Sequence, residues 1–113
     1  MKMITAIIQP EKLEEVKDAL FAIDVHRMTV SRVRGCGKQG GFEESYRGQI
    51  YKVNLLDKVR IEVAVSKDFV EPTLKAIINA AKSGSIGDGK IFVTNLERCI
   101  RIRTEESGED AIG

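Results

Sequence analysis

Two segments with helical periodicity alternate with short, strand-like segments along the chain. Over residues 13–23, apolar side chains recur at helical spacing while charged side chains occupy the other face. Pro10 suits the start of this helix, because its missing N–H costs little there. Residues 68–83 repeat the pattern, and Gly84 follows as a typical helix stop. The pattern predicts two amphipathic helices.

Residues 58–65 give the clearest strand, because valine and isoleucine alternate there with polar or small residues. We expect further strands over residues 2–8, 28–34, 51–55, 90–96 and 98–103. Strand–helix–strand thus occurs twice around a long insertion. This order predicts an α+β fold, a ferredoxin-like split βαβ sandwich with an antiparallel sheet and two helices on one face. We expect residues 1–113 to form a single domain.

Three regions of this predicted fold call for a partner or a function. Residues 35–50 are polar, contain five glycines and exceed ordinary loop length, which is typical of functional or disordered loops. Residues 104–113 are acidic and small, and we expect this tail to be mobile. Val30 and Val33 indicate an apolar sheet face opposite the helices, which an oligomer would cover.

Composition and charge exclude several classes. With 18 basic and 17 acidic residues the net charge is +1, which argues against a general nucleic-acid binder. No apolar run approaches ~20 residues, and the first residues do not read as a secretory signal. Two cysteines and one histidine argue against a disulfide scaffold, a zinc site and a Ser-His-Asp triad. We therefore expect a cytoplasmic protein with reduced thiols.

Two glycine-rich segments resemble phosphate-binding loops. Residues 35–40 spell G-x-G-x-x-G, and residues 84–90 spell all but the last letter of G-x-x-x-x-G-K-[ST]. Neither segment is followed by the helix that these nucleotide motifs require, and Ile91 replaces the magnesium-binding hydroxyl. The sequence therefore indicates a phosphate-binding protein that is neither a Rossmann dehydrogenase nor a P-loop NTPase.

The basic residues near these loops allow two interpretations each. Lys90 follows Gly89 directly and favours phosphate, whereas the glycines alone would also suit an ordinary turn. Arg101 and Arg103 would share one face of the predicted last strand, roughly 7 Å apart, as phosphate ligands or as a solvated basic edge. Lys58 reads locally as a solvent-facing lysine.

The chain resembles the PII nitrogen-regulatory signal-transduction proteins along nearly its whole length. The signature of that family is Ser or Thr, three residues, then Gly-Asp-Gly-Lys-Ile-Phe, and it stands intact from Ser83 to Phe92. The opening strand with Pro10, the Met28-Thr29-Val30 strand, the Gly35-x-Gly37-x-Gln39 segment and Arg101-Ile102-Arg103 also match. The match is specific to the family and more than a likeness of fold.

This resemblance implies a homotrimer with ATP or ADP in the clefts between subunits. Gln39 would bind a Mg²⁺ ion that also touches the phosphates and 2-oxoglutarate, and Lys58 would pair with a 2-oxoglutarate carboxylate. The implied 2-oxoglutarate site is Gln39, Lys58 and Gly87. The implied nucleotide site is Thr29, Gly37, Lys38, Gly87, Asp88, Gly89, Lys90, Arg101 and Arg103.

On the same resemblance, residues 35–57 form the T-loop region, which changes shape with the ligand and docks into partners. The implied partners are an ammonium channel, which would recruit the protein to the membrane, enzymes of nitrogen metabolism, and a nucleotidyltransferase that modifies Tyr51. Glutamine at position 49 excludes the serine phosphorylation of some members. The implied mechanism is ligand linkage without catalysis.

Three other interpretations remain open. One is an enzyme such as a slow ATPase, although no positioned base or nucleophile stands out. Another is an RNA-binding ferredoxin-like module, which needs paired aromatic residues on the sheet, whereas the last strands offer Phe92 alone. The third is a nitrogenase-regulating PII paralogue.

Overall fold

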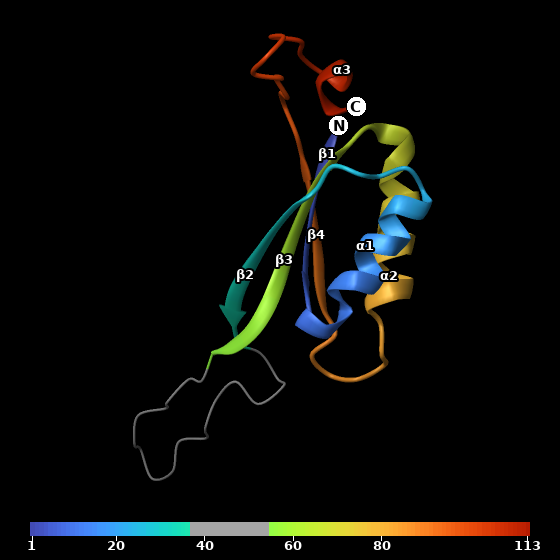
Figure 1. The fold of residues 1–113 in the computed structure, drawn as a ribbon, viewed down its shortest axis with the longest axis vertical. Coiled ribbons are helices and arrows are strands. Elements are labelled where there is room, and N and C mark those ends of the chain that lie inside the picture. The colour runs from blue at the N-terminus through green and yellow to red at the C-terminus, as the bar shows by residue number, and fades with distance from the viewer. Residues whose placement is uncertain (37–54) are drawn as a thin grey trace.

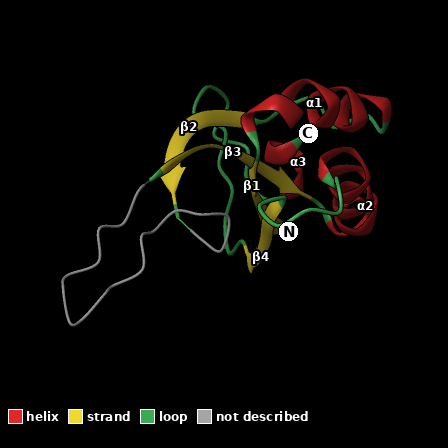
Figure 2. Cartoon of the chain, turned by 90° about the horizontal axis from the view of Figure 1, so that it is seen from below, coloured by secondary structure: helices red, strands yellow, loops and turns green. Residues whose placement is uncertain are grey.

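The computed structural model describes residues 1–36 and 55–113, which form a four-stranded antiparallel sheet covered on one face by two helices (Figures 1 and 2). The strand order is β2-β3-β1-β4. The ferredoxin-like α+β prediction is confirmed, while residues 37–54 of the insertion lie outside the described part. The strands are β1 (Lys2–Ile8), β2 (Thr29–Gly35), β3 (Leu56–Val65) and β4 (Gly89–Asn95), and the helices are α1 (Leu13–Ala22), α2 (Val70–Ala81) and α3 (Glu109–Ile112), with 3₁₀ turns over Pro10–Lys12 and Lys67–Phe69.

The core lies between the sheet and the helices α1 and α2, as the binary pattern predicts. The inner strands β1 and β3 bury alternate residues, since successive side chains of a strand point to opposite faces. Val16 and Leu20 of α1 and Ile77 of α2 complete this core, each at most 1% exposed. None of the helices in residues 1–36 and 55–113 is long and apolar enough to cross a membrane.

The sheet face away from the helices, called the open face below, differs from the prediction. Val30 pairs with Ile61 across the sheet and so points toward the helices, whereas Val33 pairs with Lys58 on the open face. The prediction that both valines mark the open face was wrong, because residues three apart on a strand point to opposite faces. By strand register the open face is mixed, carrying Lys58, Arg60, Glu62 and Lys90 beside Met3, Ile7 and Phe92.

The strand predicted over residues 98–103 is also absent from the structure. The chain reverses after Arg101 and leaves a single bridge between Ile100 and Ser107. Residues 104–113, the tail that the sequence analysis expects to be mobile, fold back and end in α3 beside the start of β1 (Figure 1). Ala111 anchors the tail, since only 8% of it is exposed.

Candidate functional site

A cavity of about 560 Å³ lies on the open face, beside the end of β2 and the first residues of β3 and β4. Its floor is the sheet, and one wall is the segment of residues 83–90, called the glycine loop below, which joins α2 to β4. The lining residues come from all four strands, from this loop and from the residue that follows β2: Ile7, Gly35, Cys36, Leu56, Lys58, Ile86, Gly87, Gly89, Lys90 and Phe92. The volume lies within the usual range for small-molecule sites.

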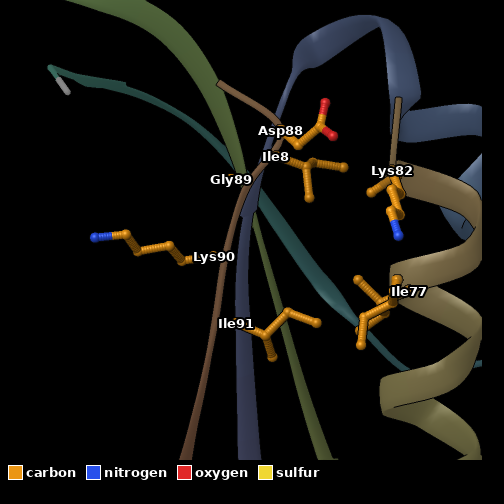
Figure 3. A pocket seen from close by; sticks show the side chains of 9 residues that line it. Ile8, Ile77, Lys82, Asp88, Gly89, Lys90 and Ile91 are labelled. Atoms are coloured by element: carbon orange, nitrogen blue, oxygen red, sulfur yellow. The ribbon is translucent and has the colours of Figure 1, made fainter. Parts of the chain in front are cut away.

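Two lysines give this cavity its charge. Lys90 lies on the open face because the neighbouring Ile91 points into the core, and the two side chains diverge to opposite sides of the sheet in Figure 3. The Lys58 ammonium donates a hydrogen bond to the Gly87 carbonyl oxygen at 3.3 Å. The glycine loop is thereby tied to β3, and both positive charges border the same cavity.

Glycine is required at position 89. Its φ of +110° is one that side chains rarely adopt, and an added Cβ would lie 1.8 Å from the Ile7 carbonyl oxygen. Gly87 also has a positive φ, +104°. Without side chains, these two residues let a ligand approach the backbone of the loop closely. The arrangement of bare backbone between two lysines suits a phosphate group.

Asp88 points away from this cavity and holds the glycine loop in shape. Its carboxylate accepts hydrogen bonds from the Ser83 amide at 2.8 Å, the Gly84 amide at 2.9 Å and the Ser83 hydroxyl. These bonds, that of the Ser83 hydroxyl first, hold the pKa of Asp88 below its ordinary value. The implied nucleotide site includes Asp88, but its carboxylate is committed to the loop itself.

A second cavity, of about 290 Å³, lies on the other side of the sheet between α2 and β4 (Figure 3). Ile8, Ile77 and Ile91 line it, and Asp88 stands at its rim. Lys82 and Lys90 also line it, but the rest of its lining is mainly apolar. The cavity on the open face adds Lys58 and Gly87 and is therefore the better candidate for a phosphate.

The structure brings together only part of the implied site. Lys58, Gly87, Gly89 and Lys90 meet at the cavity. Gly37, Lys38, Gln39 and the modifiable Tyr51 lie outside the described residues. Thr29 opens β2 six residues before Gly35, ~20 Å along the strand.

Arg101 and Arg103 follow the far end of β4 from the glycine loop. Asn95, at that end, is six strand residues or ~20 Å from Gly89. Neither arginine lies on a strand, so their predicted alternation on one face was wrong. The Arg101 guanidinium pairs instead with the Glu106 carboxylate at 3.2 Å. One chain alone therefore does not assemble the implied nucleotide site.

Sequence reasoning missed the apolar part of the cavity. Ile7, Leu56 and Phe92 line it beside the lysines, and Phe92 is 52% exposed. Ile7 and Phe92 stand at positions of β1 and β4 that alternate with core residues. An apolar residue on the outward side of an alternating strand is the signal that could have identified them.

Comparison with known proteins identifies the family. The family model for "Nitrogen regulatory protein P-II" matches residues 1–106. The chain is 52% identical over 112 residues to Nitrogen regulatory protein P-II 2 of Methanothermobacter thermautotrophicus, covering 99% of this chain and 97% of that protein. It is 54% identical to Nitrogen regulatory protein P-II of Bradyrhizobium diazoefficiens and 49% identical to Nitrogen regulatory protein GlnK of Escherichia coli, covering 99% of this chain and 100% of each relative. The chain belongs to the PII family of nitrogen regulatory proteins.

Proposed function

We propose that this PII protein is a non-enzymatic signal-transduction regulator that senses ATP or ADP together with 2-oxoglutarate and controls partner proteins through its T-loop. The cavity beside the glycine loop carries this proposal. There the bare backbone of Gly87 and Gly89 meets the ammonium groups of Lys58 and Lys90. Family membership adds that the relatives are named as regulatory proteins.

The nucleotide phosphates would lie against Gly87, Gly89 and Lys90. Glycines permit close approach of the backbone, and the lysine supplies a positive charge. The apolar side of the cavity, with Ile7 and Phe92, would receive the less polar part of the ligand. This division into a charged and an apolar side is what a nucleotide requires.

The complete nucleotide site would be built between copies of the chain in a homotrimer. Thr29, Arg101 and Arg103 lie too far from the glycine loop to reach one phosphate chain within a subunit. In a cyclic trimer, the far end of the sheet of one subunit would face the glycine loop of the next. We expect light scattering to give the mass of a trimer across a concentration series. The mass of a monomer would contradict the proposal.

Mg²⁺ and 2-oxoglutarate would enter the same cavity. Residues 1–36 and 55–113 contain no group of three His, Cys, Asp or Glu side chains that could hold a metal ion. The ion would rely on phosphate oxygens and on Gln39, which fits the preference of Mg²⁺ for substrate phosphates and few protein ligands. Lys58, already at the cavity, would pair with a 2-oxoglutarate carboxylate.

The output of the sensor would be the T-loop region, residues 35–57. Its two described ends, Gly35-Cys36 and Leu56, line the cavity, so a ligand there would touch the base of the loop directly. Docking to an ammonium channel or to enzymes of nitrogen metabolism, and modification of Tyr51 by a nucleotidyltransferase, belong to this proposal. Deleting residues 42–50 should abolish partner control and spare ATP binding.

Calorimetric titration tests the sensing mechanism. ATP affinity is measured with and without saturating 2-oxoglutarate, each in the presence and absence of Mg²⁺. We expect about 5–150-fold tighter ATP binding with 2-oxoglutarate when Mg²⁺ is present, the range of typical coupling free energies. An identical ATP affinity in all samples would contradict the mechanism, and steady ADP release in the same samples would favour the slow ATPase instead.

A further inference from the structure

Arg101 is already occupied within its own chain. Its guanidinium donates through Nη1 to Glu106 Oε1 at 3.2 Å and through Nη2 to the Asp110 carbonyl oxygen at 3.1 Å. The backbone reinforces this closure, since the Arg101 amide donates to the Glu106 carbonyl oxygen at 2.9 Å. The side chain is only 25% exposed. Two of its hydrogen-bonding nitrogens are therefore committed to the tail.

The tail that receives Arg101 is docked on the domain. The Gly108 amide donates to the Cys99 carbonyl oxygen at 2.9 Å, and Ala111 is buried. Around the docked tail, Asp110 and Gly113 share a cavity of about 510 Å³ with Val25, Ser66 and Phe69 of the main domain. The tail carries four carboxylates, on Glu105, Glu106, Glu109 and Asp110.

We propose that the docked tail is a built-in competitor of the nucleotide for Arg101. The inference rests on the proposed function, in which Arg101 binds a phosphate chain. The Glu106 carboxylate offers the guanidinium the same kind of anionic acceptor as a phosphate oxygen. Nη1 and Nη2 each already donate to the tail, and the Glu106 carboxylate offsets part of the guanidinium charge, so a phosphate bound to Arg101 competes with the tail for the same cation.

Competition for one side chain couples two equilibria. A nucleotide that takes Arg101 loosens the tail, and loosening the tail raises the affinity for nucleotide by the same factor. The Glu106 pair is partly exposed, with side chains 25% and 45% accessible, so its effect is that of a surface ion pair. Such pairs correspond to about 1.5–5-fold in an equilibrium constant. Nucleotide binding would thus reach the C-terminal end of the chain as well as the T-loop.

The test compares two single-atom changes in the full-length protein. Glu106→Gln removes the charge that Arg101 pairs with, while Glu105→Gln removes the same charge from an exposed neighbour as the matched control. We expect Glu106→Gln to bind MgATP about 1.5–5-fold more tightly than Glu105→Gln. Without ATP, the Gly108 and Ala111 amides of Glu106→Gln should exchange with solvent faster than those of the control.

A second measurement follows the tail in the unmodified protein. Saturating MgATP should accelerate amide exchange at Gly108 and Ala111, because it withdraws Arg101 from the tail. Equal MgATP affinities of the two variants, or stronger protection of the tail with MgATP, would overturn the competition while leaving nucleotide sensing intact. Absence of any MgATP binding by the unmodified protein would overturn the proposed function and this inference together.

Discussion

The glycine loop and the segment after β4 both carry residues of the implied phosphate site, yet they differ in readiness. In the glycine loop, Asp88 and Lys58 hold the backbone in place, and Lys90 projects onto the open face. In the second segment, Arg101 is turned into the tail and paired with Glu106. One region is held in shape by its own hydrogen bonds with two lysines beside it, and the other is closed on itself.

This difference separates two kinds of binding residue. Backbone groups of Gly87 and Gly89 are fixed by local turn geometry, which their own positive φ values set. A long arginine side chain takes whichever anion its surroundings offer, and here the nearest one is a carboxylate of the same chain. Ligand binding by the glycine loop should therefore weaken when a hydrogen bond within the loop is removed. Ligand binding by Arg101 should instead strengthen when the competing carboxylate is removed.

The largest expected effect concerns the shape of the glycine loop. Gly89→Ala should destabilise the protein strongly, because the new Cβ would lie 1.8 Å from the Ile7 carbonyl oxygen and because φ is +110°. The unfavourable φ alone costs on the order of 1–3 kcal/mol. Denaturant unfolding measures the loss.

Two matched glycines separate the causes in that experiment. Gly84→Ala has a φ of +90° but nothing within 4 Å of the new Cβ, so it should show the backbone cost alone. Gly35→Ala has neither problem and should be close to neutral. If Gly89→Ala lowered the free energy of unfolding no more than Gly84→Ala, the backbone of β1 at Ile7 would be able to move away from the new Cβ. The glycine loop would then not be rigidly preformed.

The next effect in size concerns the charge that the loop shares with β3. Lys58→Met should weaken 2-oxoglutarate binding by about 10–150-fold, the loss of a charge-assisted hydrogen bond. ATP binding should fall much less, through loss of the bond to the Gly87 carbonyl oxygen. Lys67→Met, an exposed lysine before α2, serves as the control. Unchanged 2-oxoglutarate binding in Lys58→Met would make Lys58 a structural tie of the loop only.

Alternation along the chain predicted most of the fold. The spacing of Val59, Ile61, Val63 and Val65 predicted β3 and its buried face, because burial on one side of a strand leaves a period of two. The strand expected over residues 98–103 was predicted from the same kind of alternation, but it is absent from the structure. Ile100 and Ile102 alternate with arginines, but in the described part of the chain they are exposed, by 49% and 95% respectively.

The geometry of the cavity was predictable where it depends on local backbone, as in the turn of Gly87 and Gly89. It was not predictable where it depends on tertiary partners. The sequence interval between Asp88 and Ser83 does not reveal that the carboxylate turns inward to bind three donors of the loop. The closure of Arg101 on Glu106 likewise requires a chain reversal, which Glu105 makes with a φ of +60°.

A smaller effect should follow from changing the Asp88 carboxylate. Because the folded pKa of Asp88 lies below its ordinary value of 3.8, its bonds stabilise the loop above that pH and are lost as the pH falls through the folded pKa. Asp88→Asn should therefore lower stability and ATP affinity at pH 7, and its deficit in stability should shrink below about pH 4. Thermal unfolding at both pH values, with the exposed Asp18→Asn as control, measures this. A deficit independent of pH would show that shape, and not charge, is what Asp88 supplies.

The smallest effect is expected from a residue that belongs to neither region. Thr73 of α2 is completely buried, and its hydroxyl finds no hydrogen-bond partner within residues 1–36 and 55–113. Replacing it with valine keeps the shape and removes an unpaired polar group, so Thr73→Val should stabilise the fold by about 1 kcal/mol. Because Thr73 lines neither the cavity beside the glycine loop nor the cavity at the tail, MgATP affinity and tail exchange should stay unchanged while denaturant unfolding shifts to higher concentration. A change in MgATP affinity in Thr73→Val would show that the stability of α2 affects the conformation of the glycine loop. The loop would then be held in place by the whole domain and not by Asp88 and Lys58 alone.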